Sequence, residues 1–130
     1  MVHLRCLASP TGVPLHRADL SRPETLILGD LNSNVIWDKP DRWWNHSDVV
    51  EELHDAGLKS IYHHQTNERE GKETVPTFFL QRNEQKAYHI DYAFASDDCL
   101  TRCSISIGDK SKWLHLSDHM PLCVDIIPKA

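Results

Sequence analysis

Two polar side chains that could do chemistry follow directly after an apolar run near residue 30. Asp30 and Asn32 come just after Leu-Ile-Leu at 26–28. On an extended backbone, side chains two residues apart point the same way. A carboxylate there can hold or deprotonate a water molecule, while an amide donates to a developing oxyanion. From this segment alone, a turn at Gly29 and Asp30 that Asn32 caps with its own side chain is the favoured interpretation.

A second acidic position lies in an apolar, aromatic stretch. Asp91 stands between Ile90 and Tyr92, where an unpaired carboxylate is costly, so we expect it to have a partner. His89 is two residues earlier and shares the period of a strand with Asp91. Asp91 could orient that histidine, but we interpret His89 as part of an exposed alternating face.

A third cluster, Ser117-Asp118-His119, precedes the last apolar segment of the chain. Asp118 is a hard oxygen ligand suited to Mg²⁺ or Mn²⁺. His119 could act as a base or stabilise charge on a phosphoryl oxygen. Alone, the cluster is equally well explained as a turn before a strand.

Composition limits the classes of protein that fit. The chain has 130 residues, 40% of them hydrophobic, which predicts a single domain over 1–130. A net charge of −5 excludes a broad basic surface for nucleic acid. The sequence shows neither a leader pattern nor an apolar run of membrane-spanning length, so we expect a soluble, cytoplasmic chain that does not bind membranes. Its four cysteines predict reduced thiols.

The elements expected to position these residues alternate short strands with one clear helix at about 45–56. Asn45 and Asp48 form a capping box for that helix, and Gly57 ends it. Strands are predicted at 1–7, 25–28, 59–62, 77–80, 88–94, 103–107 and 122–127, with loops at 8–23, 33–44 and 63–72. The strand at 25–28 is expected to be buried on both faces. The prediction is an α/β (α+β) layered fold.

Taken in order, the three clusters resemble motifs of a known family. Gly29-Asp30-Leu31-Asn32, Ile90-Asp91-Tyr92 and Ser117-Asp118-His119 resemble the Gly-Asp-x-Asn, Ile/Leu-Asp-Tyr and Ser-Asp-His motifs of the endonuclease/exonuclease/phosphatase family of metal-dependent phosphohydrolases. The segment 76–79 is similar to a Thr/Ser-aromatic segment of that family. The resemblance covers roughly residues 2–127 and corresponds to the C-terminal portion of the family's domain.

The resemblance implies both a fold and an activity. The fold would be the C-terminal part of a four-layer α/β/β/α sandwich with mixed, mostly antiparallel strands. The activity would be hydrolysis of a phosphate ester or phosphodiester by water that Mg²⁺ or Mn²⁺ activates. The substrate could be nucleic acid, phosphoinositide or another phosphodiester.

The resemblance also implies residue roles. Asp30 would position or deprotonate the attacking water and contribute to the metal site, and Asn32 would hydrogen-bond the phosphoryl oxygens. Asp118 would contribute to the metal environment, and His119 would be paired with Asp91 as base or electrostatic stabiliser. Thr77 is also expected to contact substrate. Apart from the resemblance, Trp37 follows the Asp30 loop, where an aromatic ring could stack on a base or a ligand ring, but core or loop-anchoring roles are favoured for at least two of Trp37, Trp43 and Trp44.

One departure from the family bears on completeness. The family's N-terminal half supplies an Asn ligand and a metal-binding Glu at strand ends. No Glu before Asp30 follows an apolar strand, since Glu24 comes directly after Pro23. We therefore expect an N-terminally incomplete domain whose partner is a complementary N-terminal half or a second copy.

Two other functions remain open. The fold could serve as a non-catalytic binding or interaction module. An unrelated transition-metal site is a weaker hypothesis, because its candidate residues lack compact ligand spacing. Those candidates are His63, His64, Cys99, Cys103 and His115.

Overall fold

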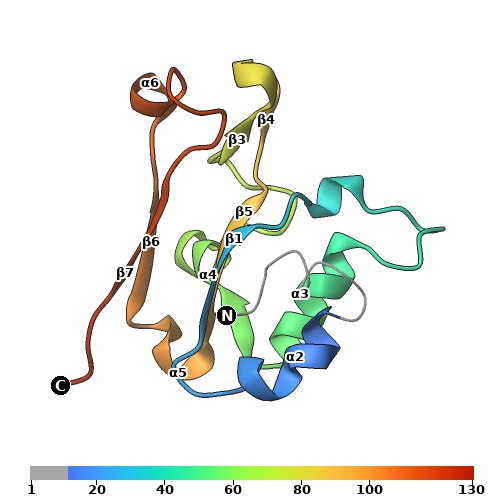
Figure 1. Ribbon diagram of the computed structural model, residues 1–130, viewed down its shortest axis with the longest axis vertical. Coiled ribbons are helices and arrows are strands. Elements are labelled where there is room, and N and C mark those ends of the chain that lie inside the picture. The colour runs from blue at the N-terminus through green and yellow to red at the C-terminus, as the bar shows by residue number, and fades with distance from the viewer. Residues whose placement is uncertain (1–11) are drawn as a thin grey trace.

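A three-stranded antiparallel sheet forms the centre of the computed structural model, which describes residues 12–130 (Figure 1). Its strands are β1 (Leu26–Asp30), β5 (Asp91–Ser96) and β2 (Leu58–Ser60), in the order β1-β5-β2. β5 is the middle strand and is buried over residues 92–96. Side chains alternate along it, so its two faces belong to two different hydrophobic clusters.

Two helices cover one face of this sheet. They are α2 (Gly12–Leu20) and α3 (His46–Asp55), which lie on the same side of the sheet in Figure 1. Val49 and Leu53 of α3 are buried in one cluster with Tyr92 and Phe94 of β5. The predicted apolar stripe of the 45–56 helix is therefore its buried face.

The other face packs against short helices and a hairpin. The helices are α4 (Ile61–Thr66) and α5 (Asp97–Leu100), and the hairpin pairs β6 (Cys103–Ile107) with β7 (Leu122–Ile126). Ile61, Leu100 and Ile105 form the second cluster with Ala93 and Ala95 of β5. Small side chains on this face of β5 let α4 and β6 approach the sheet closely.

The remaining elements are two short strands and three short helices. The strands β3 (Phe78–Phe79) and β4 (Ala87–Tyr88) pair with each other, and Phe78 also forms a single β-bridge to His119. The short helices are η1 (Val35–Trp37), η2 (Leu80–Arg82) and α6 (Lys110–Trp113). The bridge joins the segment before β7 to β3.

The start of α3 is held by two carboxylates. The Asn45 N–H donates to Asp48 Oδ2 at 2.6 Å, as the capping pattern predicts. Asp38 accepts hydrogen bonds from the N–H groups of His46 and Ser47 at 2.8 and 3.1 Å. These N–H groups have no partner within the helix, so Asp38 acts as a second cap from eight residues upstream of His46.

The prediction of α+β structure with antiparallel sheets is confirmed, and β6 has its predicted bounds. The expected single helix is wrong, because residues 12–130 contain five α-helices. Part of the predicted loop 8–23 is α2, where Pro14 occupies the first turn, a position that tolerates proline. The rest of that loop before residue 12, and the predicted strand 1–7, lie outside the described residues.

Other boundaries differ for local reasons. The predicted strand 59–62 stops at Ser60, whose Oγ accepts a hydrogen bond from the His63 N–H and so begins α4. The predicted strand 88–94 is divided between β4 and β5. All strand pairings among residues 12–130 are antiparallel rather than mixed. β1 is not buried on both faces, since Leu28 is 41% exposed. None of the helices described combines the length and apolar character that crossing a bilayer requires.

Candidate functional site

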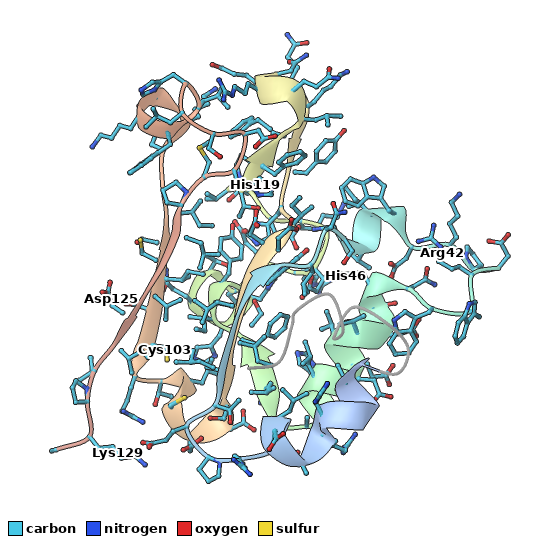
Figure 2. The ribbon with its side chains drawn as sticks, in the orientation of Figure 1. Arg42, His46, Cys103, His119, Asp125 and Lys129 are labelled. Atoms are coloured by element: carbon cyan, nitrogen blue, oxygen red, sulfur yellow. The ribbon has the colours of Figure 1, made fainter. Side chains whose placement is uncertain are left out.

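Three of the sequence-predicted residues meet at one end of the central sheet. Asp30 is the last residue of β1 and Asp91 the first of β5, and the two are register partners. His119 joins them from the segment before β7, through the bridge to Phe78. Each of the three offers a donor atom within 4.8 Å of the others. We call Asp30, Asp91 and His119 the carboxylate–histidine site (His119 is labelled in Figure 2).

The expected partner of Asp91 is His119. Its Nδ1 lies 3.0 Å from Asp91 Oδ2 and 3.2 Å from Oδ1. An ionised carboxylate only accepts hydrogen bonds, so Nδ1 carries a proton. Nε2 is therefore the ring nitrogen left for chemistry, either as a base or, when protonated, as a donor.

The hydroxyl of Thr77 holds the start of β5 in place. Its Oγ1 accepts hydrogen bonds from the N–H groups of Ile90 and Asp91 at 3.0 and 3.1 Å. Its backbone carbonyl accepts from the Met120 N–H at 2.7 Å. Thr77 is 0% exposed, so the predicted substrate contact is wrong and the residue positions both Asp91 and the segment around His119.

The segment after Asp30 leaves the extended conformation. Asn32 has a φ of 50°, in the left-handed region, and its N–H donates to Asp30 Oδ1 at 2.6 Å. The expectation that Asp30 and Asn32 project alike from one extended strand is therefore wrong. The structure contains the turn that the sequence favours, but the capping atom belongs to Asp30 and not to Asn32. Asn32 is exposed, and its side-chain amide makes no hydrogen bond with residues 12–130.

Other predicted residues lie around this site or away from it. Asp118 precedes His119, but it is outside the group of three donors; its backbone carbonyl accepts from the Phe79 N–H. Trp37 is 41% exposed, with its ring centroid 5.1 Å from that of Tyr88. His89 is 5% exposed, which corrects its interpretation as part of an exposed face.

A second group of titratable side chains was not predicted from the sequence. His63, Glu70 and Glu73 each offer a donor atom within 4.8 Å of the others. Of the residues suggested for a transition-metal site, only His63 belongs to either donor group in the described part of the chain. Cys99, Cys103 and Cys123 are free thiols, as expected, and Cys6 lies outside the described residues. The sequence signal that could have indicated this group is the high density of His and Glu between residues 63 and 73.

Burial and hydrogen bonding shift the pKa values of groups in and around this second cluster. Burial alone would raise the pKa of Glu73, but hydrogen bonds from His63, from backbone N–H groups and from Asn34 lower it to about 2. Burial lowers the pKa of His89 and raises that of Tyr92. Tyr92 is therefore a neutral hydroxyl, which donates to the carbonyls of Ser33 and His89 at 3.0 Å.

A hollow of about 470 Å³ lies near the carboxylate–histidine site but is not lined by it. Phe79 and Met120 line the hollow, together with parts of the segments 74–76 and 107–110. Asp30, Asp91 and His119 do not line it. These three residues are therefore identified as a candidate site by their distances from one another and not by this hollow.

The chain was also compared with known proteins. No protein-family model matches the sequence, and a search of curated proteins found no match either.

Proposed function

We propose that this chain is a divalent-metal-dependent hydrolase of phosphate esters or phosphodiesters, related to the endonuclease/exonuclease/phosphatase family. One observation carries the proposal. Three motifs that are far apart in the sequence bring Asp30, Asp91 and His119 within 4.8 Å of one another. A chance likeness of three short motifs would not require their polar side chains to meet.

The roles proposed for the residues follow from their surroundings. Asp91 holds Nδ1 of His119, so Nε2 accepts or donates a proton at the substrate. Asp30 is exposed and can orient or deprotonate a water molecule. Asn32 can donate its free side-chain amide to a phosphoryl oxygen, on which negative charge builds in the transition state.

The donor set suits the proposed metal. Mg²⁺ and Mn²⁺ prefer carboxylate oxygens, which Asp30 and Asp91 supply, and the adjacent Asp118 is a further candidate. When bound, such an ion would neutralise charge on the phosphoryl group and activate water. The protein's own residues supply the other contributions. Asp91 accepts the hydrogen bond from His119, His119 Nε2 transfers the proton, and the Asn32 amide donates to the phosphoryl group.

The finer fold assignment belongs to the same proposal. We propose that the sheet β1-β5-β2 and the hairpin β6-β7 are parts of the two facing sheets of a four-layer α/β/β/α sandwich. Helices α2 and α3 would form one outer layer, as their packing against Tyr92 and Phe94 suggests. Part of the hairpin faces Ala93 and Ala95 on the other side of the sheet.

Hydrolysis of bis(p-nitrophenyl) phosphate with Mg²⁺ or Mn²⁺ tests the activity. We expect turnover that EDTA abolishes, and a loss of about 10²- to 10⁴-fold in rate for His119→Ala and for Asp30→Asn. Asp125→Asn is the matched control, because Asp125 is an exposed carboxylate on β7 that should leave the rate unchanged.

Two results would contradict the proposal. Equal rates for wild type, His119→Ala and Asp30→Asn would remove the site from the reaction. Binding of a phosphodiester by the wild type without any turnover would instead favour the non-catalytic binding module.

A further inference from the structure

The second cluster lies beside β5, near the ring of Tyr92. Tyr92, the neighbour of Asp91, has its ring centroid 5.1 Å from that of His46 and 6.5 Å from that of His63. Glu70 lies between the two histidines, 3.4 Å from His46 Nε2 and 3.6 Å from His63 Nδ1. We propose that His46, His63, Glu70 and Glu73 bind one divalent transition-metal ion of the zinc class.

The two histidines are held in the same manner. Nδ1 of His46 lies 2.8 Å from Ser33 Oγ, and Nδ1 of His63 lies 2.6 Å from Ser60 Oγ. Metal-binding histidines characteristically donate one ring N–H to a nearby polar group, which leaves the other nitrogen for the metal. Donation of each Nδ1–H to its serine hydroxyl is the tautomer that the proposed site uses, since it leaves both Nε2 atoms a lone pair for the ion.

Each of these Nε2 atoms faces a glutamate. His63 Nε2 is 2.9 Å from Glu73 Oε1, and His46 Nε2 is 3.4 Å from Glu70 Oε2. A lone pair that faces a carboxylate oxygen is repelled unless a cation or a proton lies between them. In that tautomer, a cation or a proton must lie between the two atoms of each pair.

The pair of His46 and Glu70 favours a metal ion over a proton. His46 has a side chain only 1% exposed, and within residues 12–130 neither its Nε2 nor Glu70 Oε2 has a hydrogen-bond partner. Two ligands of a tetrahedral zinc ion, each at about 2.0–2.1 Å, lie about 3.4 Å apart. The pair thus has the spacing of two ligands of one ion.

The charges of Glu70 and Glu73 also favour a bound metal ion. The Glu73 side chain is 4% exposed, and Oε2 of Glu70 is buried as well. Within residues 12–130, the ion pairs of Glu70 and Glu73 are all with histidines, and none is with Lys or Arg. Burying carboxylate oxygens without a fixed cation is costly. One divalent ion would balance both.

The local backbone gathers the ligands. Glu70 and Glu73 flank Gly71, whose φ of +79° is left-handed, and a Cβ there would lie 2.6 Å from Val35 Cγ1. The Gly71 N–H donates to Glu73 Oε1 at 3.0 Å, which fixes the turn. A hollow of about 320 Å³ lined by Ser60, His63 and Glu70 gives an ion access from solvent.

Metal binding by the purified chain tests the proposal. After equilibrium dialysis against Zn²⁺, we expect one equivalent per chain, and with Co²⁺ visible absorption bands of a four-coordinate site. Glu70→Gln and His46→Ala should reduce zinc occupancy at least tenfold. His64→Ala is the matched control, because it removes the exposed neighbour of His63 on the same helix.

The wild type provides a test that does not depend on the folding of variants. In ¹⁵N NMR spectra of the imidazoles, Zn²⁺ should shift the Nε2 resonances of His46 and His63. Shifts confined to His119 or to exposed histidines, absence of stoichiometric zinc, or equal occupancy in Glu70→Gln and His64→Ala would overturn the proposal. Asp30→Asn should keep its zinc, so failure of this site and failure of the proposed hydrolase are distinguishable.

Discussion

At the scale of the residue, Thr77 shows how a side chain without access to substrate can control a site. Its single Oγ1 satisfies two successive N–H groups where the chain enters β5. The second of these belongs to Asp91, which in turn holds His119. The geometry of the carboxylate–histidine site therefore depends on a buried hydroxyl.

Replacement of this hydroxyl should cost both stability and activity. Thr77→Val keeps the shape but leaves two buried N–H groups unpaired, so we expect a loss of about 1–3 kcal/mol in the free energy of unfolding. Urea denaturation measures this loss, and hydrolysis of the model diester should fall as well. Thr101→Val, at an exposed threonine, is the control. An unchanged unfolding free energy in Thr77→Val would contradict the positioning role.

Much of the carboxylate–histidine site could be predicted from the sequence, because each of its three residues lies in a short motif of adjacent residues. Asp91 lies among apolar residues and needed a partner, and His119 is the only ring in contact with its carboxylate among the hydrogen bonds described. The role of Thr77 could not be predicted, since the N–H groups that donate to it lie 13 and 14 residues away and come close only through the pairing of β3 with β4. The pair of His63 and Glu73 could not be predicted either, because the two residues are far apart in the sequence and a left-handed turn at Gly71 brings them together.

At the scale of the element, helix boundaries followed from short-range signals where these existed. Asn45, Asp48 and Gly57 are all within or beside α3, and its predicted extent is confirmed to within a residue or two. In contrast, the residues of α4 have strand-like composition at Ile61 and Tyr62. A helix forms there because Ser60 caps it and its two apolar residues are buried against the sheet.

Asp38 should stabilise α3 from outside the helix. Asp38→Ala removes the acceptor for two N–H groups of the first turn, so we expect a loss of about 1–2 kcal/mol in the free energy of unfolding. Thermal and urea unfolding followed by circular dichroism measure it. Asp41→Ala changes an exposed aspartate of the same loop and should have little effect. Equal stability of the two variants would rule out the capping role.

At the scale of the whole molecule, β5 joins the two hydrophobic clusters. Tyr92 and Phe94 belong to the cluster with α2 and α3, while Ala93 and Ala95 belong to the cluster with α4, α5 and β6. Because one strand contributes to both, neither cluster can form completely without it. We therefore expect residues 12–130 to unfold cooperatively.

A larger side chain on β5 tests this dependence. Ala93 is 0% exposed, so Ala93→Leu should force α4 and β6 away from the sheet and cost about 1–3 kcal/mol. Tryptophan fluorescence, to which Trp44 beside the α3 cluster contributes, and far-ultraviolet circular dichroism should show one shared transition at lower denaturant. Ala87→Leu, on the exposed side of β4, is the control. Two separate transitions in the wild type would contradict cooperative unfolding.

The pairing of Asp30 with Asp91 also restricts which insertions and deletions the protein can tolerate. A slip of one residue between β1 and β5 would exchange the faces of Asp91 and Tyr92. The carboxylate would then enter the cluster below α3, and the phenol would take its place beside His119. A single inserted residue near position 90 would therefore disable both sites at once, whereas an insertion in the exposed segment 81–86 would leave the register of both strands intact.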